Sequence, residues 1–225
     1  QAISYFQHTL ILKPNCPETH IELSMSQLLN GDYSSGWKNY DWRWNLKSSP
    51  KRHDHPKTDL WQGEKLKKGD DLIIVSEQGL GDTLQFMRYI PYLRNQNLNI
   101  AFYVQTKLHS LIKASGIDSN PLTPSLVNSV SEGKWIPLLS IPKLLNVRKN
   151  SPIVSNPYIS APNELINKWE LILSNEKKPI IGINWQGNPS AEKGDLKGRS
   201  LPLELFSEIC INKDLKFLSL QKGFG

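Results

Sequence analysis

The clearest hydrophobic pattern in the chain lies between residues 72 and 93. Residues 72–75 are a short continuous apolar run, which is typical of a strand buried on both faces of a sheet. The run is followed by the glycines Gly79 and Gly81, which predict a turn. Apolar side chains then recur at helical spacing: Leu84, Met87, Tyr89 or Ile90, and Leu93. A strand, a glycine turn and a helix in this order predict the first crossover of a parallel α/β sheet.

The residue of greatest functional interest is Asp82, at the start of the predicted helix. Ligands of open parallel sheets bind beyond the carboxyl ends of the strands, and Asp82 is predicted to lie there. The dinucleotide fingerprint needs a third glycine where this chain has Leu84, and the Gly-Lys-Ser/Thr ending of a phosphate loop is absent. One interpretation makes Asp82 a base for an acceptor hydroxyl. The other makes it a helix N-cap.

Weaker patterns predict the remaining α/β elements. A second strand is expected at 99–104 and a helix at 106–114, whereas residues 117–160 have many prolines and read as irregular. Within them, residues 135–142 are either a loop that lines a cleft or a buried connection. An amphipathic helix at 163–174 precedes a strand at 179–185, a helix at 201–210 and a strand at 216–220. This last unit predicts the start of a second α/β sheet.

The N-terminal segment has a helical repeat pattern. Ala2 and Phe6 recur 34 residues later as Gly36 and Tyr40, which is the spacing of tetratricopeptide helix pairs. Helices are expected at 2–14, 18–30 and 34–45. Three tryptophans follow Gly36, and they either pack this segment against the next domain or form a binding surface: Trp37, Trp42 and Trp44. Because a stable array needs about three repeats, we expect the chain to be part of a longer one.

Composition narrows the functional classes. Hydrophobic residues make up 38% of the 225 residues and charged residues 21%, as expected for a globular protein in water. No apolar run approaches the roughly 18 residues of a membrane helix, so we expect no membrane span. The net charge is +6, but aromatic residues do not alternate with the lysines that contribute to it. This favours a solvated basic face over a nucleic-acid site. Cys16 and Cys210 lack a metal-site spacing, which favours free thiols and a cytoplasmic location.

A linker is expected at residues 47–69, because most of this segment is polar and proline-containing without an apolar period. His53, Asp54 and His55 lie within it and invite a metal interpretation. With no fourth ligand nearby, ordinary exposed histidines are the preferred interpretation, and no metal site is predicted.

Six pieces of the chain, taken in order, resemble glycosyltransferases of the two-domain GT-B type fused to tetratricopeptide repeats. The pieces are residues 31–44, 61–63, 77–86, 138–142, 181–189 and 199–203. The resemblance covers almost the whole chain and extends distantly to the heptosyltransferases of lipopolysaccharide synthesis. It implies tetratricopeptide helices at 1–46, a Rossmann-like domain at 70–162, and a linking helix with the start of a second Rossmann-like domain at 163–225.

The resemblance also implies roles for individual residues. Asp82 matches the Gly-Asp aspartate that acts as a base on the acceptor. Residues around it are expected to line the acceptor cleft: Glu77, Gln78, Gly79, Gly81 and Gln85. The first loop of the second domain meets the donor phosphates in these enzymes, and four residues occupy the comparable region here: Asn188, Lys193, Lys197 and Arg199.

The implied activity is metal-independent transfer of a sugar from a nucleotide-sugar donor to a hydroxyl, without a cofactor. The acceptor would be a glycan or a protein presented by the repeats. Family members continue with further elements that hold the donor, and these are absent here, so we expect no transfer by this chain alone. Two alternatives remain: a non-catalytic tetratricopeptide scaffold with a degenerate α/β domain, and a nucleotide-binding module of another enzyme class.

Overall fold

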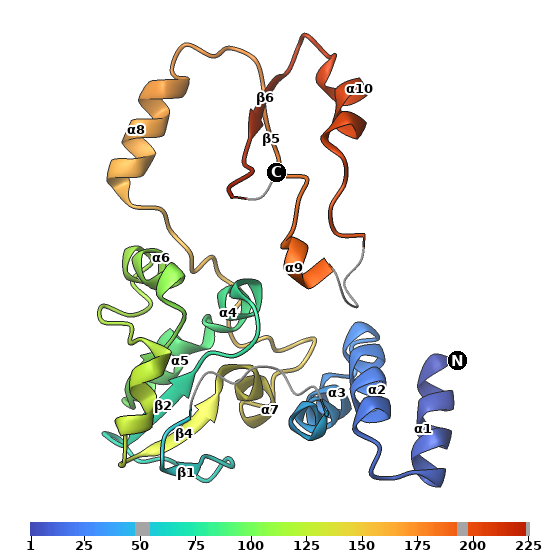
Figure 1. Ribbon diagram of the computed structural model, residues 1–225. Coiled ribbons are helices and arrows are strands. Elements are labelled where there is room, and N and C mark those ends of the chain that lie inside the picture. Colours follow the sequence, from blue (N-terminus) through green and yellow to red (C-terminus); the bar gives the residue numbers. More distant parts are fainter. Residues whose placement is uncertain (48–54, 193–197, 224–225) are drawn as a thin grey trace. The chain divides into compact units, whose positions relative to one another are not determined.

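The computed structural model describes residues 1–47, 55–192 and 198–223. The chain forms two compact units, residues 1–162 and residues 163–225. The first unit holds N-terminal helices and a four-stranded parallel sheet, and the second holds a two-stranded parallel sheet (Figure 1). This confirms the expected mixed α/β class with parallel strands.

Helices begin the first unit, close to the ranges expected from the sequence. Their bounds are α1 (Ala2–Leu12), α2 (Pro17–Leu29), α3 (Tyr33–Tyr40) and the 3₁₀ helix η1 (Asp41–Asn45). Helices α2 and α3 approach closely at Gly36, where a Cβ atom would lie 2.7 Å from side-chain atoms of Leu28. The buried hydroxyl of Ser24 donates to the Gly36 carbonyl at 2.9 Å. The absence of a side chain at Gly36 is therefore what allows this helix pair to form.

The sheet has the strand order β1-β4-β2-β3, and all its pairs are parallel. The strands are β1 (Asp59–Leu60), β2 (Asp71–Val75), β3 (Asn99–Tyr103) and β4 (Lys134–Pro137). Leu72 and Ile74 of β2 belong to the main core, whereas Ile73 and Val75 pack into a smaller cluster that includes Trp135. Because β2 is covered on both faces, its residues form a continuous apolar run rather than an alternating one.

The region expected to be one helix after β2 is two short helices. Helix α4 (Leu80–Phe86) ends before Met87, and α5 (Tyr89–Asn95) follows. Pro91 explains the break, because proline has no N–H to donate to the carbonyl of Met87 and its ring would clash with that carbonyl in a continuous helix. The expected apolar positions still face the core, and Met87, Ile90 and Leu93 are buried.

Two strands were not predicted. Strand β1 lies in the segment expected to be a linker, and Trp61 beside it is buried. Strand β4 lies between β1 and β2, in the region that was read as irregular. Two- and four-residue strands are too short to show a period. The segment 135–142 is thus largely buried, with β4 followed by η4 (Leu138–Ser140) and α7 (Ile141–Leu144), and its residues Ile136, Pro137 and Ser140 also line a pocket.

The N-terminal helices and the sheet share one core. The Trp37 ring meets the Phe86 ring of α4 edge to face, with centroids 5.7 Å apart, and Tyr40 belongs to the main buried cluster. Trp42 instead stacks on His20 of α2, with centroids 3.9 Å apart. Packing of the helical segment against the following domain is thus confirmed for Trp37.

Further elements complete the two units. In the first they are η2 (Thr106–Leu108), α6 (His109–Ala114) and η3 (Pro124–Ser129). In the second they are α8 (Asn163–Leu173), β5 (Ile180–Ile183), α9 (Pro189–Glu192), η5 (Leu203–Phe206), α10 (Ser207–Cys210) and β6 (Lys216–Ser219). Strands β5 and β6 pair in parallel, as the pattern predicted. No helix in the described ranges has both the length and the apolar character to cross a bilayer.

Substitution of Gly36 tests the close approach of α2 and α3. We expect Gly36→Ala to lower the free energy of unfolding by about 1–3 kcal/mol, because the added methyl overlaps Leu28. Gly81→Ala is the matched control, since Gly81 is also helical but has open space around it. Alanine there should raise stability by up to about 1 kcal/mol through its helix propensity. Equal effects in urea unfolding would contradict the close approach.

Candidate functional site

The candidate site lies at the carboxyl edge of the four-stranded sheet, in the turn from β2 to α4. Parallel strands end at the same edge, so this turn is a neighbour of the segment that follows β4. The turn spans residues 76–79 and leads directly into α4, which carries Asp82. Residues from α3, η1 and η4 also reach this edge, and their contacts decide the shape of the turn.

Asp82 is held by a single hydrogen bond. Its Oδ2 atom accepts the backbone N–H of Gly79 at 2.9 Å. Gly79 is the N-cap residue, so α4 begins at Leu80 and Asp82 caps from its third position rather than from the N-cap itself. The side chain is partly exposed, and no described group forms a hydrogen bond with Oδ1. The hydrogen bond to Oδ2 thus orients the carboxylate, while Oδ1 remains available to accept a hydrogen bond or a proton.

Gln78 gives the turn its unusual backbone. Its φ is 61°, a left-handed conformation that a residue with a long side chain adopts at a cost of about 1–3 kcal/mol. Two contacts hold it there. The Gln78 amide donates to the Tyr40 hydroxyl at 3.0 Å, and the Gln78 carbonyl accepts from Gln105 Nε2 at 3.4 Å. Thr83 of α4 in turn donates to Gln105 Oε1 at 2.9 Å, which ties the turn to the end of β3.

A buried ion pair lies directly before Gln78. Arg43 of η1 donates to both carboxylate oxygens of Glu77, from Nη2 at 2.8 Å and from Nε at 3.1 Å. The side chains of both residues are only 2% exposed. Glu77 Oε1 also accepts the backbone N–H of Leu139, which follows β4. Glu77 therefore joins three parts of the chain, and it lies inside the protein rather than on the wall of an open cleft.

The guanidinium group of Arg43 also donates hydrogen bonds to acceptors other than Glu77. Arg43 Nη1 donates to the Tyr40 carbonyl at 3.2 Å and to Asp41 Oδ1 at 3.1 Å, and Nη2 donates to Ser140 Oγ at 2.8 Å. The cation lies over the rings of Tyr40 and Trp44, with 4.7 Å and 4.3 Å to their centroids. Complete pairing is what makes a buried charge tolerable, since its desolvation is costly.

Burial also changes protonation at this edge. Desolvation raises the pKa of Glu77, and the Arg43 charge and hydrogen bonds oppose that rise without cancelling it. Desolvation likewise raises the pKa of the Tyr40 hydroxyl, while the Gln78 amide lowers it. A raised pKa keeps Tyr40 neutral, which suits a hydroxyl that accepts a hydrogen bond in a buried position.

The other residues expected at the acceptor cleft have varied surroundings. Gly79, Gly81 and Gln85 are exposed, and Gln78 is partly buried. They lie on the same turn and helix as Asp82, so the structure brings them together with it. The sequence offered no sign of Arg43, because a lone arginine among aromatic residues looks like any surface residue of a helix.

The loop expected to meet donor phosphates belongs to the second unit. Arg199 is exposed and described, whereas Lys193 and Lys197 lie outside the described residues. The Asn188 carbonyl accepts the Glu192 N–H at 3.2 Å. Ser200 Oγ accepts the Gly187 N–H at 3.0 Å and donates to Glu192 at 2.5 Å. Glu192 therefore adds an acidic side chain to this loop, which no motif in the sequence indicates.

Metal ligands do not gather at this edge. Within the described ranges, no three His, Cys, Asp or Glu side chains are grouped to hold a metal ion. His55 stacks on Trp135, with ring centroids 5.5 Å apart, and its neighbours His53 and Asp54 lie outside those ranges.

The Arg43–Glu77 pair can be tested through stability. We expect Arg43→Met to lower the free energy of unfolding by about 3–5 kcal/mol at neutral pH, because it leaves the Glu77 carboxylate buried without its cation. Lys134→Met is the matched control, since it removes a cation from an exposed pair with Asp59. That loss should stay within about 1 kcal/mol.

The effect of Arg43→Met should depend on pH. Removing Arg43 removes the influence that lowers the pKa of Glu77, so this pKa rises further in the variant. A carboxyl group with a raised folded-state pKa loses its stabilising contribution as pH rises through that pKa. The gap between parent and variant should therefore widen in chemical denaturation as pH rises from the Glu77 pKa of the parent toward the higher Glu77 pKa of the variant. A gap that is constant or narrows would contradict an unpaired buried carboxylate.

Comparisons of the chain with family models, with curated proteins and with solved structures found no match. The function is therefore argued from the residues at the carboxyl edge of the sheet.

Proposed function

We propose that the chain forms the acceptor side of a glycosyltransferase, with Asp82 as the general base. The observation that carries the proposal is the single anchoring of Asp82: Gly79 holds Oδ2, and no described group forms a hydrogen bond with Oδ1. A base must be oriented and must keep one oxygen free for the incoming proton. The position after the first turn of a parallel sheet supports a role at a ligand.

The proposed reaction moves a sugar from a nucleotide donor to a hydroxyl. Asp82 accepts the hydroxyl proton while the hydroxyl oxygen forms a bond to the anomeric carbon. The bond from that carbon to the diphosphate breaks, and the diphosphate leaves with the electron pair. In the transferases that the sequence resembles, basic residues in the first loop of the second domain neutralise the charge that develops on it, and we assign this role to Arg199, Lys193 or Lys197. The sequence resemblance to GT-B transferases is the second support for this assignment, and the reaction would need no metal.

A scaffold is the second candidate, and one observation favours it. Large apolar side chains are exposed on α1 and α2: Tyr5, Ile11, Leu12, Met25 and Leu29. Such residues on neighbouring helices suit contact with a further helix or with a protein partner. The two candidates differ in what they require of Asp82, because a scaffold has no need of its free oxygen.

Substitution of Asp82 distinguishes its proposed role as a general base from a role as a helix cap alone. In a longer protein that includes the donor-binding elements expected from the resemblance, we expect Asp82→Asn to reduce turnover about 100-fold, the lower end for loss of a general base. Asparagine can still accept the Gly79 N–H, so the melting temperature should barely change. Asp32→Asn is the matched control, because Asp32 caps α3 by accepting the Ser35 N–H. Release of nucleoside diphosphate from a panel of nucleotide sugars is the measurement. Unchanged turnover in Asp82→Asn would leave Asp82 as a cap alone.

The basic loop provides a test on the donor side. If Arg199 binds a phosphate with two parallel hydrogen bonds, Arg199→Ala should weaken binding of a nucleoside diphosphate about 10- to 150-fold in a longer protein that includes the donor-binding elements. Lys193→Ala and Lys197→Ala should have smaller effects. Arg148→Ala, an exposed arginine of the first unit, is the control. Small and equal losses by calorimetry for all the loop variants would remove the support of this loop and favour the scaffold.

A further inference from the structure

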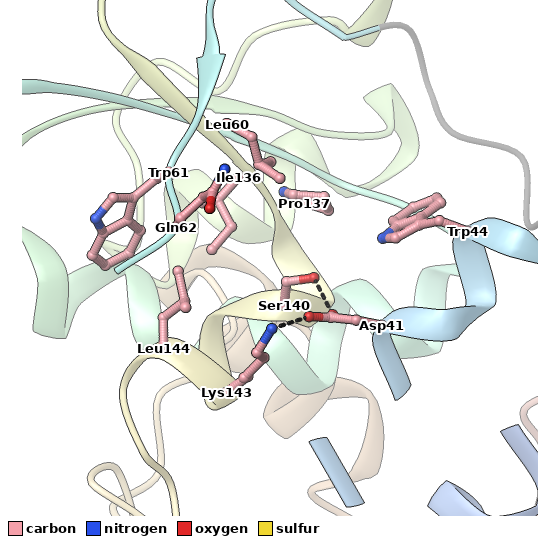
Figure 2. A pocket seen from close by; sticks show the side chains of 10 residues that line it. All are labelled: Asp41, Trp44, Leu60, Trp61, Gln62, Ile136, Pro137, Ser140, Lys143 and Leu144. Carbon is pink, nitrogen blue, oxygen red and sulfur yellow. Dashed lines mark hydrogen bonds and ion pairs between the residues drawn. The ribbon is translucent and has the colours of Figure 1, made fainter. Parts of the chain in front are cut away.

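A second feature of the carboxyl edge is a pocket of about 300 Å³ between the ends of β1 and β4, η1 and α7 (Figure 2). This volume is at the lower end of the range for small-molecule sites. Its lining comes entirely from the first unit: Asp41, Trp44, Leu60, Trp61, Gln62, Ile136, Pro137, Ser140, Lys143 and Leu144. None of the residues assigned above to the acceptor cleft or to the donor loop lines it.

One side of the pocket is apolar. Leu60, Ile136 and Pro137 come from the strand ends, and Leu144 of α7 adds a further aliphatic side chain. Trp61 is fixed beside them, because its indole N–H donates to the Glu64 carbonyl at 2.8 Å. These side chains suit the C–H face of a ring and offer it no hydrogen bonds.

The pocket also has polar groups, and some of them have hydrogen-bonding capacity that is not used. Lys143 donates to Asp41 Oδ2 at 2.5 Å, and Ser140 donates to Asp41 Oδ1 at 3.1 Å (Figure 2). An ammonium group has three donors, and Lys143 shows one hydrogen bond within the described ranges. The exposed side-chain amide of Gln62 has no hydrogen-bond partner among the described residues. The pocket therefore presents the free donors of Lys143 on its polar side, and the amide of Gln62 lies among the apolar side chains beside Ile136 (Figure 2).

The charges at the pocket balance. Lys143 and Arg43 carry two positive charges, and Asp41 and Glu77 carry two negative ones within the same connected network. A charged ligand would have to break one of these pairs or remain uncompensated. A purely apolar ligand would cover the Lys143–Asp41 pair without replacing its contact with water. A neutral ring that has one C–H face and several hydroxyl groups satisfies both walls.

From this arrangement we propose that the pocket binds one sugar ring of a neutral glycan. The ring would lie against the Leu60, Ile136 and Leu144 side chains, with its hydroxyls on Lys143 and Gln62. The inference rests on the proposed function in one respect, since a transferase whose acceptor is a glycan would use such a subsite to hold it. Binding itself needs neither Asp82 nor a donor.

The test is titration of the isotope-labelled chain with neutral methyl glycosides of glucose, galactose and N-acetylglucosamine. We expect at least one to bind with a Kd on the order of 1 mM, as suits a ligand with few atoms. Chemical-shift changes should centre on Gln62, Lys143 and Leu144. Glucose 6-phosphate and uridine test an anionic sugar and a nucleobase as occupants. Stronger binding of either at these residues, or shifts elsewhere only, would overturn the proposal.

Substitutions at the pocket test whether the glycoside binds there. Gln62→Ala should weaken binding about 2- to 10-fold, the loss of one ordinary hydrogen bond. Gln96→Ala, an exposed glutamine at the end of α5, is the matched control and should bind as the parent does. Leu60→Trp should abolish binding by filling the pocket, and its cost to folding should be small because Leu60 is 44% exposed. A Leu60→Trp variant that still binds the glycoside would overturn the proposal.

The same experiment distinguishes failure of the pocket from failure of the proposed transferase. Asp82→Asn should bind the glycoside normally. In a longer protein that includes the donor-binding elements, glycoside binding without any sugar transfer would contradict the transferase and leave the pocket in place. Transfer without binding at Gln62 and Lys143 would contradict the pocket alone.

Discussion

The buried ion pair between Arg43 and Glu77 is the interaction on which the carboxyl edge of the sheet depends. Both side chains are 2% exposed, and the guanidinium also bonds to the Tyr40 carbonyl, Asp41 and Ser140. The pair therefore connects the N-terminal helices with the segments that follow β2 and β4. Removing one partner would leave a buried charge, so each segment constrains the position of the others.

This pair makes the N-terminal helices part of the site. Tyr40 and Arg43 contact Gln78 and Glu77, the two residues that precede the Gly79 cap of α4. The strained φ of Gln78 is thus maintained by contacts from α3 as well as from Gln105. The shared core fits both candidate functions, because a sheet that only supported the helices of a scaffold would also pack against them.

The same network links the two proposed binding regions. Asp41 bonds to Arg43 on one side and to Lys143 in the pocket on the other. The backbone before Asp82 is held through Glu77, the other partner of Arg43. A ligand on Lys143 would therefore contact a group that is connected to Glu77 of the turn through three successive ion pairs: Lys143–Asp41, Asp41–Arg43 and Arg43–Glu77.

The sequence predicted those features that depend on residues close together in the chain, and it missed those that depend on residues far apart. The apolar run at 72–75 and the glycines after it determined a buried strand and a turn, because backbone and burial preferences act over a few residues. Gly36 marked the close approach of two helices for the same reason. Pro91 was a local signal for the helix break, although the apolar period masked it. Strands β1 and β4 were too short to show any period, so only pairing with neighbours revealed them.

By itself, then, the sequence determined the α/β class, the parallel arrangement and the position of Asp82 near the start of a helix. Only the tertiary structure decided that Glu77 is buried against Arg43, 34 positions earlier in the chain. Only it placed Leu60, Gln62 and Lys143 around one pocket. The physical reason is that local patterns set which residues are apolar or turn-forming. The partner of a buried charge and the walls of a pocket are chosen by packing between segments that are distant in sequence.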